Sequence, residues 1–316
     1  MKIPKLAGLS AILLLCGCFS EVRVQGTPEE IAARTAALID KGDTDSAVLE
    51  LNYLLRRDPD YVPAYCLRAN AYAKAQQFPQ AIEDYTKVIE LSSTTDCGNY
   101  GSVFYDRGYS YFISGKPLSA AKDFIQEVKR NPQNGAAYGL MARALRDECF
   151  FAKDAGMPNW IRYCARAIDS FDKAYAVSGG SQPFFDKAVV YNQMGYYKNA
   201  MSELGKLHAA PGKDIRPADI CYETALALYG LQDYQNSVEQ FTRAIALDTD
   251  NFEYYFRRGL AFSALEDYKS AILDFNTALS YRGGFTAALR ARADAAQRQE
   301  YALDQIQGGA TGSGLK

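Results

Sequence analysis

Few residues of this chain have the types and spacing that catalysis requires. The single histidine, His208, comes at the end of a predicted helix, and no serine or cysteine motif offers it a nucleophilic partner. No glycine-rich loop of the kind that cradles phosphate is present. The carboxylates Asp106, Asp186 and Glu223 recur on one helix face, where solvated charge is the usual role. The sequence therefore favours a non-enzymatic protein that needs no cofactor.

The cysteines are the other residues whose spacing could support chemistry. Five of the seven lie beyond residue 18: Cys66, Cys97, Cys149, Cys164 and Cys221. No two of these have the short spacing of a zinc-binding pair, so we predict no metal site. Cys149 and Cys164 are equally distant from Gly156-Met157, and an antiparallel helix pair turning there places them at the same level. We therefore expect a disulfide between them, with buried thiols as the alternative.

A repeated pattern of apolar and small residues predicts the elements that position these groups. In the copy from 251 to 284, one face of the first helix carries Tyr255, Arg258-Gly259 and Phe262. The matching face of the second helix carries Ala271, Phe275 and Ala278. The copy 34 residues earlier has Cys221, Thr224-Ala225, Leu228, Ser237, Phe241 and Ala244 at the same offsets. A fixed period in this range is typical of a helical solenoid, in which each unit covers its neighbour's apolar face.

The same frame recurs with repeat starts near 28, 62, 101, 135, 181, 218 and 252. Its small residues, its aromatics and a closing proline such as Pro59 or Pro132 resemble the tetratricopeptide repeat (TPR), and the resemblance covers roughly residues 28–285. It implies an all-α fold, an α-solenoid of about seven helix-turn-helix units. We expect a capping helix over 286–306 and a flexible tail over 307–316, because glycines begin at Gly308.

The fourth copy is longer than the others by about a dozen residues, around positions 153–159. We expect both of its helices to run on, to turn near Gly156–Pro158, and to project a hairpin that carries Trp160. This hairpin is either a plain surface insertion or a projection that binds a partner.

Cys66 and Cys97 both lie near the starts of first helices, which share one edge of such an array, so they form a second candidate disulfide.

The N-terminus has the layout of an export signal. Lys2 and Lys5 precede an apolar stretch over 6–15, which is shorter than the roughly 20 residues of a bilayer-spanning helix. Leu15-Cys16-Gly17-Cys18 follows, and the whole resembles a bacterial lipoprotein signal. The resemblance implies removal of 1–17, lipidation of Cys18, a tether over 18–27 and a periplasm-facing protein of the cell envelope; Phe19 favours the outer membrane. An ordinary secretory signal and a short uncleaved anchor are the alternatives.

The charge pattern argues against a nucleic-acid partner. The chain has 35 basic and 37 acidic residues, and the two signs are interspersed rather than gathered on one face. We therefore expect protein or peptide partners.

In the TPR family, the concave face is built by the first helix of each pair. Carried over to this chain, the resemblance gives a partner-binding groove of Tyr105, Asp106, Tyr109, Arg143, Phe185, Asn192, Tyr222, Phe256 and Arg257. Exposed aromatics flanked by charges suit a bound peptide. We expect Tyr105, Tyr109, Tyr222 and Phe256 to point away from the packing face and to anchor it, with Arg143 orienting an acidic or carbonyl group. Alternatively, these rings only fill the interior of the superhelix.

Together, these observations predict a membrane-anchored scaffold that recruits other envelope proteins. The alternative is a structural assembly factor of a pilus-type or secretion-type complex, which acts by associating with itself or with an oligomer. A homo-oligomer is therefore compatible with the sequence. A defined oligomeric mass of the mature protein would favour this second hypothesis.

Overall fold

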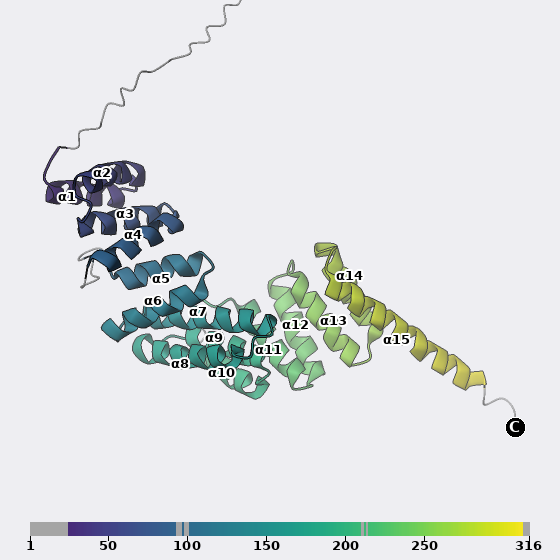
Figure 1. Ribbon diagram of the computed structural model, residues 1–316. Helices are drawn as coiled ribbons and strands as arrows, with labels where there is room; N and C mark the ends of the chain where they lie inside the picture. The colour runs from purple at the N-terminus through teal and green to yellow at the C-terminus, as the bar shows by residue number, and fades with distance from the viewer. Residues whose placement is uncertain (1–24, 93–96, 98–100, 210–211, 213, 312–316) are drawn as a thin grey trace, which may run out of the picture. The chain divides into compact units, whose positions relative to one another are not determined.

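The structure, a computed structural model, describes residues 25–92, 97, 101–209, 212 and 214–311. These residues form fifteen helices and no strand, which confirms the predicted all-α fold (Figure 1). The chain divides into two compact units, Met1–Val103 and Phe104–Lys316, each built of stacked helix-turn-helix pairs. We describe the units separately.

The first unit contains two antiparallel helix pairs. Its helices are α1 (Pro28–Asp40), α2 (Thr44–Arg57), α3 (Val62–Lys74) and α4 (Phe78–Leu91). A capping box starts α1, because the Thr27 hydroxyl accepts from the Glu30 amide while the Glu30 carboxylate accepts from the Thr27 amide. Leu51, Leu54 and Leu67 fill the interior between the pairs. Apolar burial of this kind, rather than intrinsic helix propensity, stabilises such short helices.

A disulfide closes the end of the first unit. Cys66 on α3 is bonded to Cys97, which follows α4, and their Cα atoms are 5.7 Å apart. Cys66 is buried in a cluster with Tyr85, Val88 and Val103.

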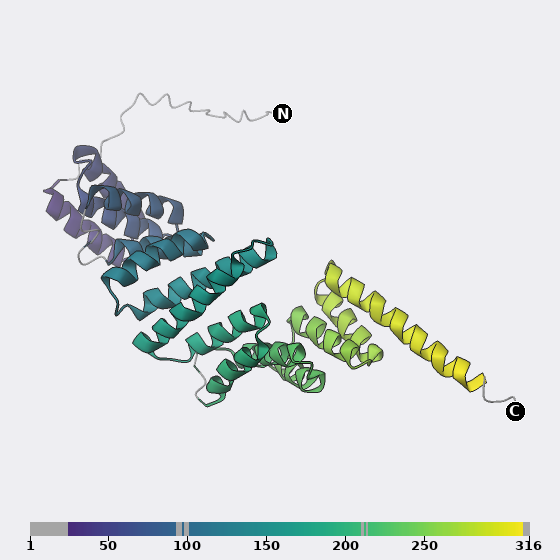
Figure 2. The same cartoon turned by 60° about the horizontal axis from the view of Figure 1, so that its bottom comes forward.

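The second unit contains five further pairs and a terminal helix (Figures 1 and 2). The elements are α5 (Val103–Ile113, whose first residue belongs to the first unit), α6 (Pro117–Arg130), α7 (Gly135–Asp154), α8 (Trp160–Ser178), α9 (Gln182–Met194), α10 (Tyr197–Ala209), α11 (Pro217–Gly230), α12 (Tyr234–Leu247), α13 (Phe252–Ala264), α14 (Tyr268–Tyr281) and α15 (Thr286–Thr311). The first helices of the pairs begin within two residues of the predicted repeat starts.

Small residues and rings hold the two helices of each pair together, as the repeat pattern predicts. Four of the second helices, α6, α8, α12 and α14, bury one phenylalanine each at the same place in the frame: Phe124, Phe171, Phe241 and Phe275. Gly259 on α13 faces this position, and a Cβ atom there would lie 2.7 Å from the Phe275 ring. A larger residue at Gly259 would therefore force the pair apart.

A buried ion pair also joins the two helices in several repeats. Arg107 donates two hydrogen bonds of 2.7 Å to Asp123, and Arg258 donates two of 2.8 Å to Asp274. Bidentate pairing satisfies both carboxylate oxygens, as a buried acid requires.

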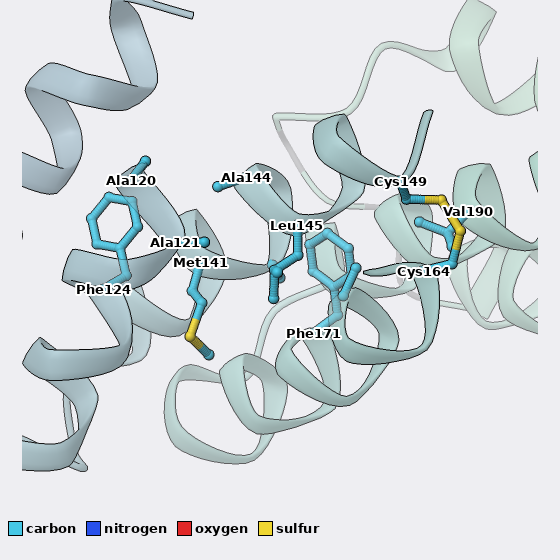
Figure 3. Packing of buried hydrophobic residues seen from close by; sticks show 12 residues of the cluster. Ala120, Ala121, Phe124, Met141, Ala144, Leu145, Cys149, Cys164, Phe171 and Val190 are labelled. Carbon is cyan, nitrogen blue, oxygen red and sulfur yellow. A yellow bond between two sulfur atoms is a disulfide. The ribbon is translucent and has the colours of Figure 1, made fainter. Parts of the chain in front are cut away.

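The fourth repeat is extended as the sequence predicts. Its helices α7 and α8 have 20 and 19 residues, whereas the other paired helices of the unit have 11 to 14. Cys149 and Cys164 are bonded across the pair, with Cα atoms 5.1 Å apart. Figure 3 shows the disulfide at the side of Leu145 and Phe171, beside Val190 of the next repeat. The Cys149–Cys164 disulfide therefore lies inside the core, where α9 packs against it.

The terminal helix α15 is longer than predicted. It runs to Thr311, through Gly308 and Gly309, where the sequence places the start of the tail. Glycine disfavours a helix interior by only about 1 kcal/mol relative to alanine, so it does not force an end. Ala288 and Ala295 are the buried contacts of α15.

The predicted signal 1–17, Cys18 and most of the tether lie outside the described residues. Among the described helices, none combines the length and apolar content needed to cross a membrane.

Candidate functional site: a groove along the first helices

Two adjoining cavities of about 460 and 580 Å³ lie along the first helices α7, α9, α11 and α13 of the second unit. Both cavities are lined by Phe150, Val189, Tyr222 and Glu223. We call the two cavities together the groove. Its walls come from four successive repeats, so any ligand lying along it would contact several repeats at once.

Four of the nine predicted groove residues line these cavities: Phe185, Asn192, Tyr222 and Arg257. Tyr222 is largely buried, and its ring lies 5.0 Å from that of Tyr254, which also lines the groove. Burial raises the pKa of the Tyr222 hydroxyl far above its ordinary value, so this residue stays neutral at physiological pH.

The three predicted residues on α5 lie outside the two cavities. Tyr109 is exposed, and Tyr105 packs edge-on against Phe124 with the ring centroids 5.9 Å apart. Burial, and then the nearby Glu127 carboxylate, raise the pKa of Asp106 to about 7.

Arg143 makes an ion pair within the protein. Its Nε atom lies 3.3 Å from the Asp186 carboxylate, and Arg146 donates a 2.7 Å hydrogen bond to the other oxygen of that carboxylate. Gln182 adds a third donor.

The prediction that Phe256 points away from the packing face is wrong. The ring is 7% exposed and belongs to the core, with its centroid 4.8 Å from that of Phe285 and 6.0 Å from that of Phe275. The physical reason is its place in the last repeat, where Phe285, just before α15, covers the ring. Phe256 therefore belongs to the end of the array and not to the groove.

The expectation that the recurring carboxylates are solvated is also wrong for two of them. Asp186 is 3% exposed and Glu223 is 9% exposed. Both lie five residues after the starts of their repeats, at 181 and 218, and both accept hydrogen bonds from the first helix of the preceding repeat. A periodic pattern on one helix does not reveal that the neighbouring helix covers this position.

The two buried acids, Asp186 and Glu223, have different hydrogen-bond partners. Asp186 accepts from two arginines of the preceding repeat, whereas Glu223 accepts a 2.8 Å hydrogen bond from the Asn192 amide. Among the described residues, Glu223 makes no ion pair. Burial raises the pKa of its carboxyl to about 7, and the Asn192 hydrogen bond opposes that shift only in part.

The enlarged hairpin of the fourth repeat supplies one wall of the groove. Phe150 and Lys153 come from the extra turns of α7, and Trp160 from the start of α8. The Lys153 ammonium lies 5.4 Å from the Trp160 ring and donates to the Gln193 carbonyl. Phe150 and Lys153 were not predicted from the sequence as groove residues. The extra length of the fourth copy is the signal that could have identified them.

Within the described residues, no group of three or more histidine, cysteine or acidic side chains could hold a metal ion. The side chain of His208 lies outside the described part of the chain.

Comparison with known proteins agrees with this architecture. Two models of the tetratricopeptide repeat family match residues 62–94 and 222–285. DnaJ homolog subfamily C member 3 of Rattus norvegicus is 22% identical over 229 residues, which is 68% of this chain and 42% of the relative. The chain thus spans less than half the length of this curated relative.

Two solved structures are similar in fold. The C-terminal part of a TPR repeat-containing protein from Cytophaga hutchinsonii has a TM-score of 0.59 at 15% identity, covering 82% of this chain and 98% of that one. A tetratricopeptide repeat protein from Parabacteroides merdae has a TM-score of 0.55 at 16% identity, covering 84% and 98%. At these identities the similarity shows the fold alone. Such repeats indicate a protein–protein interaction scaffold, and the two family matches show that the chain contains tetratricopeptide repeats.

Proposed function

We propose that this protein is a lipid-anchored interaction scaffold of the bacterial cell envelope, and that it holds a segment of a partner protein in the groove of the second unit. The observation that supports this most is the make-up of the groove. Phe150, Phe185 and Tyr222 line a concavity although none of them is fully buried, so packing alone does not require these rings there. Partly exposed aromatics in a concave site are the usual anchors of a bound peptide.

Site-specific photocrosslinking in intact cells tests the groove. A benzoylphenylalanine in place of Tyr229, which lines the groove, should capture a defined partner. The matched control replaces Leu247, which is 57% exposed on α12 of the same repeat. Capture from both positions alike, or from Leu247 only, would place the partner elsewhere on the array.

The lipid anchor is tested at Cys18. Inhibition of lipoprotein signal peptidase should leave a larger precursor, and Cys18→Ser should release the protein from the membrane fraction. A Cys18→Ser protein that is still processed and membrane-bound would remove the anchor from the proposal without affecting the groove.

A structural role through self-association has one observation in its favour. Tyr301 and Leu303 on α15 are 67% and 51% exposed, which leaves apolar surface on the terminal helix. The mass of the mature protein in solution distinguishes the two functions. A defined oligomer that Tyr301→Glu dissociates favours the assembly factor, whereas a monomer favours the scaffold.

A further inference from the structure

Two equivalent contacts between successive repeats differ in one residue. Arg146 and Asn192 both lie eleven residues after the starts of their repeats, at 135 and 181. Each reaches the buried acid of the next repeat, so that Arg146 contacts Asp186 and Asn192 contacts Glu223. We call these contacts the arginine step and the asparagine step. The asparagine step keeps the acid but lacks the cation.

With Glu223 ionised, the unused hydrogen-bonding capacity of the two side chains in the asparagine step consists of acceptors. The Asn192 amide nitrogen donates to the Glu223 backbone carbonyl at 2.9 Å and to its carboxylate at 2.8 Å, which uses both of its hydrogens. The Asn192 side-chain oxygen is buried and has no hydrogen-bond partner in the described part of the chain. A carboxylate and an amide oxygen together favour a ligand that brings several donors, as an ammonium or guanidinium group does.

The cations around the groove are already engaged. Arg146 is paired with Asp147 and Asp186, and Arg257 is paired with Glu253. Lys153 donates to the Gln193 carbonyl. The other groove acids, Asp147, Asp219 and Glu253, are paired with Arg146, Arg216 and Arg257, so Glu223 is the groove carboxylate without an ion pair among the described residues.

The aromatic side chains beside Glu223 can pack against the aliphatic stem of a basic side chain. Phe150 and Tyr222 line both cavities with Glu223, and Trp160 lines the larger one. Aromatic faces attract a cation and also pack against the aliphatic stem of lysine or arginine.

We propose that the groove selects a partner segment carrying a lysine or arginine, whose charged group binds at the Glu223 carboxylate in the place that Arg146 has beside Asp186. This inference rests on the proposed function, because it names the chemistry of the ligand in the same groove. A basic side chain completes the asparagine step, and an acidic or apolar one leaves the buried carboxylate without a cation beside it.

Binding of the cation is linked to ionisation of Glu223. The groups around Glu223 are the paired Arg146, Asp147, Asp219, Glu253 and Arg257, together with Lys153. Burial raises the pKa of the Glu223 carboxyl to about 7. The ionised fraction of Glu223 therefore rises from about a tenth at pH 6 to about nine-tenths at pH 8, and affinity for a lysine peptide should rise roughly tenfold over this range.

The test uses a display library of random 12-residue peptides. The library is selected for binding to the full mature protein in its wild-type, Glu223→Gln and Glu239→Gln forms. Glu239 on α12 is an exposed control that gives the same change of charge in the same repeat. Trp160 is the only tryptophan and lines the groove, so its fluorescence reports binding of each selected peptide and of its lysine-to-norleucine analogue.

We expect the wild-type and Glu239→Gln proteins to enrich one fixed basic position. The norleucine analogue should bind about tenfold more weakly, and Glu223→Gln should remove that difference. Peptides enriched without a basic residue, or a lysine preference that persists in a folded Glu223→Gln protein, would overturn the inference and leave the groove function standing. No enrichment on any form would count against both.

Discussion

The arginine step and the asparagine step occupy the same positions of successive repeats, yet they leave their acids in different states. Asp186 is neutralised by Arg146 and Arg143, so this acid joins two repeats and is satisfied. Glu223 is almost as deeply buried but accepts its side-chain hydrogen bond from an amide and makes no ion pair among the described residues, and burial raises its carboxyl pKa to about 7. The repeat frame thus fixes where an acid is buried, and the residue facing it from the preceding repeat decides whether that acid supports the fold or remains available to a ligand.

The largest expected effect concerns the α7–α8 hairpin, which supplies Arg146 to the arginine step and Phe150 to the wall of the groove. Replacing Cys149 and Cys164 by serine removes a staple across 15 residues, which should lower the free energy of unfolding by about 3 kcal/mol in the chain-entropy model. Hydrogen exchange should increase first in α7 and α8, because repeat arrays open locally.

Serines in place of Cys66 and Cys97 provide the control for this double replacement. That disulfide belongs to the first unit, so its loss should leave exchange in α7 unchanged. Unchanged exchange in α7 and α8 after loss of the Cys149–Cys164 bond would show that packing alone fixes the hairpin.

The second prediction concerns the sign of the pH dependence at Glu223. Its folded pKa of about 7 lies above the ordinary value of 4.5, so the folded state holds the proton more tightly. This contribution to stability is present below pH 4.5 and is lost as the pH rises through 7. Glu223→Gln cannot lose it, so the variant should be more stable than wild type by roughly 2–3 kcal/mol at pH 8.5 and nearly equal to it at pH 4.5.

Urea denaturation at the two pH values measures this difference. Asp106, whose pKa is also raised, titrates in both proteins and cancels in the comparison. Asp186→Asn is the matched control at the arginine step, and it should destabilise the protein at pH 8.5 because Arg143 and Arg146 both lose their ion pair with Asp186. A stabilising Asp186→Asn would mean that the two steps do not differ as described.

The third prediction weakens the arginine step directly. Arg146→Met removes the 2.7 Å charged hydrogen bond to Asp186 but leaves Arg143 and Gln182 in place. We expect a loss of about 1.5–2 kcal/mol in the free energy of unfolding, at the lower end for hydrogen bonds to charged groups. A loss above about 3 kcal/mol would show that Arg143 does not compensate.

The sequence predicts the fold well because the repeat pattern records packing within each helix pair. Phe275 and Gly259 could be placed from their spacing, since each faces its own partner helix. The groove was predicted less completely. The burial of Glu223 depends on a neighbouring repeat, and that of Phe256 on Phe285, which follows the last repeat. Such contacts lie outside the frame of a single repeat, so the periodicity does not show them.

The fourth prediction converts the asparagine step into the arginine step. Asn192→Arg places an internal guanidinium beside Glu223, where the larger cavity has room for it. The new cation should return the pKa of Glu223 toward its ordinary range and raise stability at pH 8.5 by about 1 kcal/mol. The gain is small because Asn192 is only partly buried and the pair is solvent-screened.

The same variant should lose the affinity for basic peptides that the groove is proposed to have, because its own arginine occupies the acceptor site. Trp160 fluorescence measures the affinity for the peptide, and urea denaturation measures the free energy of unfolding of the protein. Asn192→Leu separates the two causes, since it removes the amide without adding charge and should keep part of the lysine preference. If Asn192→Arg gains stability yet binds the lysine peptide as wild type does, Glu223 is not the acceptor of the ligand's charge, and the two steps differ in structure alone.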